Sequence, residues 1–225
     1  MILTYYGHAC FKLELNGKHI LIDPFISLNP KAAHIAIDEI PVDYILITHA
    51  HYDHIMDVER IAERTKAKII SNHEIVTYYE SKGFSGHGMN HGGSWQFDFG
   101  KVKMLNATHS SSFPDGTYGG NPAGFLISDD SNCLYLAGDT GLHMDMKLIP
   151  LFRKPNIAIL PIGGNFTMDV EEAIMASDFI ECNDIIGSHY DTAEAIIIDH
   201  EKAKSDFNAK GKKLILLDIG AQWHS

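Results

Sequence analysis

The segment Thr48-His49-Ala50-His51-Tyr52-Asp53-His54 places four metal-ligating side chains within six residues. It overlaps the end of the apolar run Tyr44–Thr48, which has the length and composition of a strand buried on both faces. Imidazole and carboxylate groups suit zinc, or iron and manganese where oxygen ligands contribute more. A cluster of this kind at the end of a buried strand predicts a metal site rather than an ordinary polar loop.

Three more ligand-type residues occur later in the chain in the same setting. His109, Asp139 and His189 each lie two residues beyond the end of a predicted strand. In α/β folds the carboxyl ends of strands gather at one edge of a sheet, and sites form there. Together these residues supply the further ligands that a pair of adjacent metal ions needs.

Length and composition describe a globular protein with no nucleic-acid signature. The chain has 225 residues, of which 45% are hydrophobic and 21% charged, and its 18 Lys and Arg against 29 Asp and Glu give a net charge of −11. We expect one domain over residues 1–225 that acts on a small molecule, because an acidic domain is poorly suited to binding phosphate backbones. Three isolated cysteines and the lack of a long apolar run predict reduced thiols, no membrane span and a cytoplasmic location. A homo-oligomer is compatible with these features.

The order of predicted elements favours an α/β (α+β) fold with two packed sheets. Short strands come first, joined by the hairpin turn Asn16-Gly17, and strands then alternate with helices in two successive series. This order predicts two mixed β-sheets packed face to face with helices outside, a four-layer αββα sandwich. We expect the main helices at Ile55–Arg64, His73–Ser81, Val170–Ile180 and Asp199–Asn208, and a glycine-rich loop at Gly83–Ser94.

The ligand pattern resembles that of a known superfamily. His-x-His-x-Asp-His followed by a spaced His, Asp and His is similar to the ligand signature of the metallo-β-lactamase fold. Other motifs resemble a bacterial and archaeal subfamily of uncharacterised metal-dependent hydrolases related to L-ascorbate-6-phosphate lactonase. These motifs span nearly the whole chain: Gly7-His8-Ala9, Ile22-Asp23-Pro24, Gly88-Met89-Asn90, Thr108-His109-Ser110-Ser111, Gly138-Asp139-Thr140 and the run Pro161–Met168.

The resemblance implies a binuclear centre and a hydrolytic reaction. It assigns one metal to His49, His51 and His109, the second to Asp53, His54 and His189, and a bridging position to Asp139. The implied reaction uses a metal-bridging hydroxide to cleave a small ester, lactone or phosphoester, with Asp53 and Asp139 as the catalytic carboxylates. Two divalent ions per chain are expected, with zinc as the first choice and manganese, iron or nickel as alternatives.

Residues around the ligands have weaker assignments. Asp23 ends a strand before Pro24, where its carboxylate could accept the outer N–H of a ligand histidine or simply form a turn. His8 and Asn165 occupy positions that the resemblance places along the cleft, where they would contact substrate or make structural hydrogen bonds. His91 is expected to have no part in the centre.

Two other functions fit parts of the same pattern. A mononuclear-iron oxidoreductase acting on thiols or persulfides has a similar ligand set, and a non-catalytic metal protein is the third alternative. His51 stands where the flavodiiron branch carries a carboxylate, and Asp139 stands where the commonest zinc β-lactamases carry a cysteine. These two positions argue against oxygen reduction and antibiotic hydrolysis as the activity.

Overall fold

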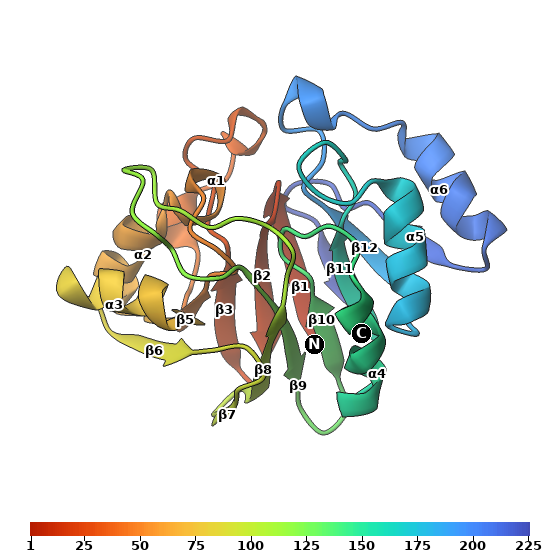
Figure 1. Ribbon diagram of the computed structural model, residues 1–225. Helices are drawn as coiled ribbons and strands as arrows, with labels where there is room; N and C mark the ends of the chain where they lie inside the picture. Colours follow the sequence, from red (N-terminus) through yellow and green to blue (C-terminus); the bar gives the residue numbers. More distant parts are fainter.

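The computed structural model describes residues 1–225 and contains two seven-stranded mixed β-sheets (Figure 1). In spatial order, the first sheet contains β14 (Gln222–His224), β1 (Ile2–Gly7), β2 (Cys10–Leu15), β3 (Lys18–Ile22), β4 (Tyr44–Leu46), β5 (Lys68–Asn72) and β6 (Gly86–Met89). The second contains β13 (Lys213–Ile215), β12 (Asp184–Ser188), β11 (Ile157–Pro161), β10 (Cys133–Leu136), β9 (Ala123–Ser128), β8 (Gly100–Asn106) and β7 (Ser94–Phe97). This architecture confirms the predicted pair of packed mixed sheets.

Helices cover the outer face of each sheet. On the first sheet these are α1 (Tyr52–Ile55), α2 (Val58–Thr65) and α3 (His73–Ser81), and on the second they are α4 (Ile149–Phe152), α5 (Val170–Phe179) and α6 (His200–Ala209). Short 3-10 turns lie at Pro30–Ala32, Ile37–Glu39, Met144–Leu148 and Glu194–Ile196. The carboxylate of Asp169 caps α5 by accepting the Glu172 N–H at 2.9 Å, as the spacing of these two residues predicts.

Side chains that alternate between the two faces of each strand explain why the fold has four layers. Ile20 and Ile22 of β3 lie in the apolar core between the sheets, whereas Leu21 packs towards the helices of the first sheet. In β11, Ile157 and Ile159 face the central core and Leu160 faces the helices of the second sheet. Since successive side chains of a strand point to opposite faces, apolar runs of this type need cover on both sides. Three apolar cores therefore separate four layers.

Two strands lie where the sequence predicts none. β6 pairs in parallel with β5 inside the segment expected to be a glycine-rich loop. Gly86 is needed there because a β-carbon at this position would overlap the Val76 side chain of α3. β14 pairs antiparallel with β1 at the other edge of the sheet. Both strands are short edge strands, whose sequences carry little periodic signal.

The fold brings the candidate site residues to one end of both sheets. No strand of one sheet pairs with a strand of the other. The chain passes to the second sheet at residues 90–93, after β6, and returns to the first at residues 216–221, between β13 and β14. The loops after β4, β8, β10, β11 and β12 gather at the upper end of the molecule in Figure 1. None of the helices combines the length and apolar character needed to cross a bilayer.

Candidate metal centre

The first four candidate ligands follow β4 and enter α1. His49 and His51 lie in the extended segment before the helix, with His51 as the residue that precedes its first turn. Asp53 and His54 lie within α1, where the sequence predicts a turn before a single longer helix. The short helix turns these two side chains towards the histidines before it. His49 and His54 are fully buried.

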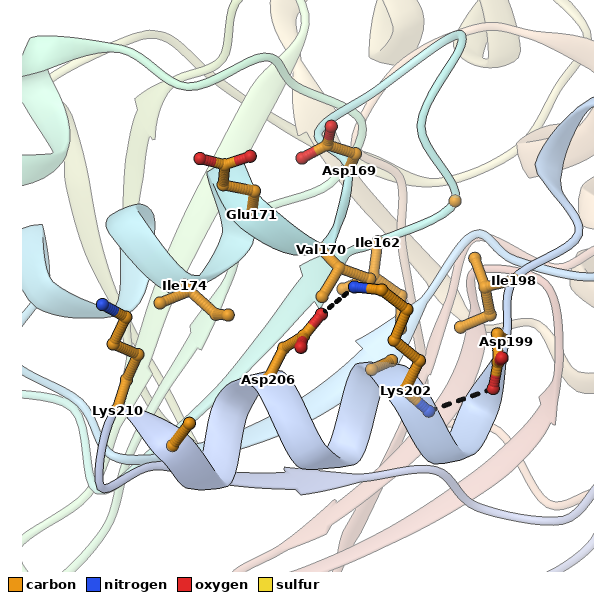
Figure 2. Close-up of a pocket in the computed structure, with 13 residues that line it drawn as sticks. Ile162, Asp169, Val170, Glu171, Ile174, Ile198, Asp199, Lys202, Asp206 and Lys210 are labelled. Atoms are coloured by element: carbon orange, nitrogen blue, oxygen red, sulfur yellow. Dashed lines mark hydrogen bonds and ion pairs between the residues drawn. The ribbon is translucent and has the colours of Figure 1, made fainter.

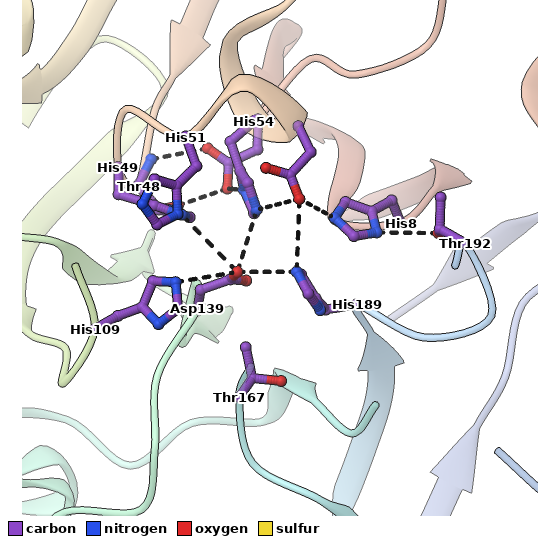
Figure 3. A network of polar contacts seen from close by, with 12 residues as sticks. His8, Thr48, His49, His51, His54, His109, Asp139, Thr167, His189 and Thr192 are labelled. Carbon is purple, nitrogen blue, oxygen red and sulfur yellow. Dashed lines mark hydrogen bonds and ion pairs between the residues drawn. The ribbon is translucent and has the colours of Figure 1, made fainter. Parts of the chain in front are cut away.

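Asp139 lies at the centre of the cluster (Figure 3). Its Oδ2 atom is 3.0 Å from His189 Nε2, 3.3 Å from His54 Nε2 and 3.7 Å from His109 Nε2. The distance to His49 Nε2 is 3.9 Å. One carboxylate oxygen therefore lies close to imidazoles carried by both sheets.

Around this carboxylate the ligand atoms form three overlapping groups. One contains His49, His51 and His109, and it agrees with the set expected for the first metal. In this group His49 Nε2 and His51 Nδ1 are 3.0 Å apart. A second group contains Asp53, His54 and His189 together with His8, and a third joins Asp139 to His49 and His54.

A close approach of the two sheets positions Asp139. Gly138 has a φ of +64°, and a β-carbon there would lie 2.9 Å from both the Ala123 carbonyl oxygen and the Thr48 Cβ. Only glycine fits this left-handed, crowded position without displacing its neighbours. It brings Asp139 next to the segment that begins the first ligand cluster.

Asp23 orients two of the histidines from behind. Its carboxylate accepts the Thr48 N–H at 2.8 Å, the Thr48 hydroxyl at 2.7 Å and the His54 Nδ1–H at 2.9 Å. The Thr48 hydroxyl oxygen in turn lies 3.0 Å from His49 Nδ1, as an acceptor for that ring N–H. With their Nδ1 atoms engaged, His49 and His54 present Nε2 to the cluster.

His8 holds the carboxylate of Asp53. Its Nε2–H donates to Asp53 Oδ2 at 2.9 Å, and its Nδ1 accepts the Thr192 hydroxyl at 3.0 Å. Burial lowers the pKa of His8 from 6.5 to about 4, although its hydrogen bond to Asp53 acts in the opposite direction. His8 is therefore neutral at pH 7, in the tautomer that donates from Nε2.

Burial keeps most of the candidate ligand histidines neutral. It lowers the pKa values of His49, His51 and His109, with smaller contributions from the neighbouring imidazoles. Neutral imidazoles carry the lone pair that a metal ligand requires. Burial alone would raise the pKa of Asp139, but the His54 and His189 imidazoles hold it well below the ordinary value, so this carboxylate is ionised.

The donor set fits a divalent cation. His54 Nε2 and Asp139 Oδ1 are buried without a hydrogen-bond partner, which is costly for polar atoms. Although burial acts against it, the carboxylates of Asp139 and Asp23 raise the pKa of His54 well above its usual value. A proton on His54 thus balances buried negative charge, and a cation at the same point would balance that charge and satisfy the unpaired atoms.

Backbone strain is concentrated at the same place. His8, Asp23, Asn165 and His189 all have positive φ angles, between 43° and 57°, which non-glycine residues rarely adopt. Such conformations cost about 1–3 kcal/mol each and cluster at functional sites. Asn165 makes no contact with the candidate ligands that would define a role for it, whereas His8 and Asp23 do.

Several residues of the site escape prediction from the sequence. Thr48 and Thr192 hold ligands or their partners, and Ser110 lies 3.3 Å from His51 Nε2. In the view of Figure 3, Thr167 lies below Asp139 and His189 without a drawn contact to either. Lone hydroxyl residues in loops are common, so only their adjacency to ligand motifs offers a signal.

A separate cavity of about 560 Å³ lies between α5 and α6 (Figure 2). Ile162, Ile174 and Ile198 form part of its apolar wall, and Lys202 and Asp206 form an ion pair beside it. None of the seven candidate ligands lines this cavity. The chemistry of the ligand cluster therefore does not extend into it.

Comparisons with known proteins agree with the geometry. The family model described as Beta-lactamase superfamily domain matches residues 2–189, a range that contains all seven candidate ligands. A UPF0173 metal-dependent hydrolase of Flavobacterium johnsoniae is 62% identical over 220 residues, covering 98% of each chain. A homologue of the same name from Methylacidiphilum infernorum is 50% identical over 220 residues, covering 97% of each chain. Igni18, a metallo hydrolase of the archaeon Ignicoccus hospitalis, has a similar solved structure with a TM-score of 0.90 and 36% identity, covering 100% of this chain and 98% of that one.

Proposed function

Since the chain belongs to the β-lactamase superfamily and, within it, to the UPF0173 metal-dependent hydrolases, we propose that it hydrolyses a small ester, lactone or phosphoester at a binuclear centre. The observation that carries this proposal is the convergence of four imidazoles on one carboxylate oxygen of Asp139. A single oxygen in this position suits a bridge between two cations, because its charge offsets part of their repulsion.

Each half of the donor set would hold one ion. His49, His51 and His109 would bind the first, and Asp53, His54 and His189 the second. When bound, two divalent ions lower the pKa of water from 15.7 towards about 7 and polarise the oxygen of the group that is cleaved. Zinc is the expected metal for this histidine-rich set, with manganese, iron and nickel as alternatives.

The side chains around the metal ions would orient the reacting groups and shield them from bulk water. Asp53 is fixed by His8 on one carboxylate oxygen, so its position does not depend on solvent. Its pKa lies well below the ordinary value; burial acts to raise it, but the hydrogen bond from His8 and the nearby His54 outweigh burial. Asp53 therefore stays ionised at neutral pH, where it would bind metal and orient the attacking water.

Metal analysis combined with a substrate screen tests the proposal. We expect about two ions per chain after purification without added metal. We also expect hydrolysis in a screen of generic esters, lactones and phosphodiesters with Zn²⁺, Mn²⁺ or Fe²⁺. One iron per chain together with oxygen consumption on a thiol substrate would instead identify the mononuclear-iron oxidoreductase.

His8→Ala is expected to weaken metal binding by about 10- to 100-fold, the usual effect of removing a partner of a metal ligand. The substitution leaves Asp53 without its hydrogen bond, so the carboxylate loses its fixed orientation. Titration of the metal-free protein with Zn²⁺ measures the change in affinity. His91→Ala is the matched control, because its ring N–H donates to the Pro122 carbonyl outside the cluster. Unchanged affinity in His8→Ala, or an equal loss in His91→Ala, contradicts the assignment.

A further inference from the structure

Large apolar side chains are exposed on the loops around the candidate metal centre and on the short helix α1. More than half of the accessible surface of each is exposed. Exposed apolar groups gathered around a site commonly contact a ligand. We call the following five residues the apolar rim: Leu28, Tyr52, Tyr118, Phe166 and Ile197.

Tyr52 is part of the first ligand cluster. It lies between His51 and Asp53 in the sequence and is 57% exposed. Its ring is 5.9 Å from that of Phe25, which lies 5.7 Å from the imidazole of His8. Aromatic contacts therefore connect the exposed ring of Tyr52, through the buried ring of Phe25, to the side chain that holds Asp53.

Phe166 belongs to the loop between β11 and α5. In the view of Figure 3 the neighbouring Thr167 lies below Asp139 and His189, without a drawn contact to either. The loop is fixed there because the Met168 N–H donates to the Thr140 carbonyl at 3.0 Å, one residue after Asp139. Phe166 itself is 58% exposed, so its ring is available to a bound molecule.

The loop of Tyr118 is joined to the first ligand cluster. The hydroxyl of Ser111 donates to the Gly119 carbonyl at 2.9 Å and accepts the Ala50 N–H at 3.1 Å. Ala50 lies between His49 and His51. Tyr118 is thus carried by a loop that packs against the histidine pair.

The loops of Leu28 and Ile197 are fixed by acidic side chains near the centre. The N–H of Ser27 donates to Asp57 Oδ2 at 2.9 Å, two residues beyond α1. The loop that carries Ile197 is closed by Asp191, which accepts the Ile198 N–H at 3.0 Å. Asp191 lies two residues after His189. Both loops are therefore anchored next to candidate ligands.

The same loops contain almost no fixed positive charge. Of the 18 Lys and Arg in the chain, Lys31 alone lies in the segments that connect strand ends to the next element at this end of the molecule. These segments are residues 8–9, 23–43, 47–57, 90–93, 107–122, 137–143, 162–169, 189–199 and 216–221. Sites that bind phosphate groups commonly supply Arg or Lys beside them. This surrounding suits an uncharged molecule better than a phosphorylated one.

We propose that the apolar rim binds the hydrocarbon part of an uncharged carboxylic ester or lactone, which the centre hydrolyses in preference to phosphoesters. This proposal rests on the hydrolase function proposed above. In the reaction, water adds to the acyl carbon and the acyl C–O bond breaks. The products are an alcohol, a carboxylate and a proton, and for a lactone the alcohol and carboxylate remain in one molecule.

The proposal predicts that kcat/KM depends on the length of the substrate's acyl group. Complete burial of one methylene group is worth about a fourfold gain in binding. The rim is partly open, so we expect a smaller gain per group. From an acetate to an octanoate ester with the same leaving group, kcat/KM should rise at least about 10-fold.

Hydrolysis of p-nitrophenyl acetate, butyrate and octanoate by the metal-loaded protein measures this dependence. p-Nitrophenyl phosphate and bis(p-nitrophenyl) phosphate provide the phosphoester comparison with the same leaving group. Phe166→Ala should lower the octanoate-to-acetate ratio of kcat/KM by about fivefold or more. Leu151→Ala is the matched control, since Leu151 is 77% exposed on α4, outside the rim, and its substitution should leave the ratio unchanged.

Calorimetric titration provides a readout that needs no turnover. Octanohydroxamate should bind the metal-loaded protein at least about 10-fold more tightly than acetohydroxamate, and Phe166→Ala should reduce that difference. If no substrate is hydrolysed but octanohydroxamate binds more tightly than acetohydroxamate, the proposed function is wrong, whereas binding of hydrocarbon chains by the apolar rim is supported. If a phosphoester has the highest kcat/KM, or if neither measurement depends on chain length, the proposal of the rim is overturned.

Discussion

Replacing Asp139 with asparagine should reduce hydrolysis by more than about 100-fold, a loss larger than that expected from changing a partner of a ligand. The substitution keeps the shape of the side chain but removes the negative charge on which four imidazoles converge. Without that charge, two neighbouring cations would repel each other with less compensation. Metal content measured after dialysis should fall below that of the unaltered protein.

The control for this variant is the same substitution at an exposed position. Asp145 accepts a hydrogen bond from Asn106 at 3.1 Å and lies outside the ligand groups. Asp145→Asn should retain both metal content and activity. Full activity with full metal content in Asp139→Asn would refute the bridging role.

Removal of metal should lower the thermal unfolding midpoint by about 8–16 °C. Metal present at about 1,000 times its dissociation constant stabilises the folded state by about 4 kcal/mol, and each kcal/mol shifts Tm by about 2–4 °C in a chain of this size. The physical reason here is the buried Asp139 carboxylate with its unpaired Oδ1, together with His54 Nε2, which has no hydrogen-bond partner. Calorimetric scans of chelator-treated and reloaded protein measure the shift.

Asp139→Asn protein provides a second comparison for the thermal experiment. Its Tm should respond less to metal, because the bridging charge is absent. The same scans with Asp145→Asn should reproduce the full shift. An unchanged Tm after demonstrated metal loss would mean that the donor set contributes nothing to folding stability.

The sequence predicts the layers of the fold because its strands are apolar on both faces. β3, β4, β5 and β11 need cover on both faces. The order of the elements, strands first and then two series of alternating strands and helices, favours two packed sheets with helices outside over one doubly wound sheet. β6 and β14 cannot be predicted in this way. Their pairing depends on partners that the fold brings to the sheet edges, and α3 packs closely against β6 only because Gly86 has no side chain.

The candidate ligands can be predicted from residue type and from position after a strand, whereas their supporting contacts cannot. His49, His109 and His189 each lie beyond a strand end and meet in the structure around Asp139. The hydroxyls of Thr48 and Thr192 depend on side-chain directions that a one-dimensional pattern does not contain. His8 shows the same limit, because its motif indicates the cleft but not the contact with Asp53.

The candidate ligands come from two sheets that share no strand. This division determines the stage of folding at which the site is complete. His49, His51, Asp53 and His54 follow a strand of the first sheet, whereas His109, Asp139 and His189 follow strands of the second. The first sheet also contains β14, so a nascent chain that ends before Asp139 has neither the complete first sheet nor the central carboxylate. The seven candidate ligands therefore come together only when both sheets have formed and packed against each other.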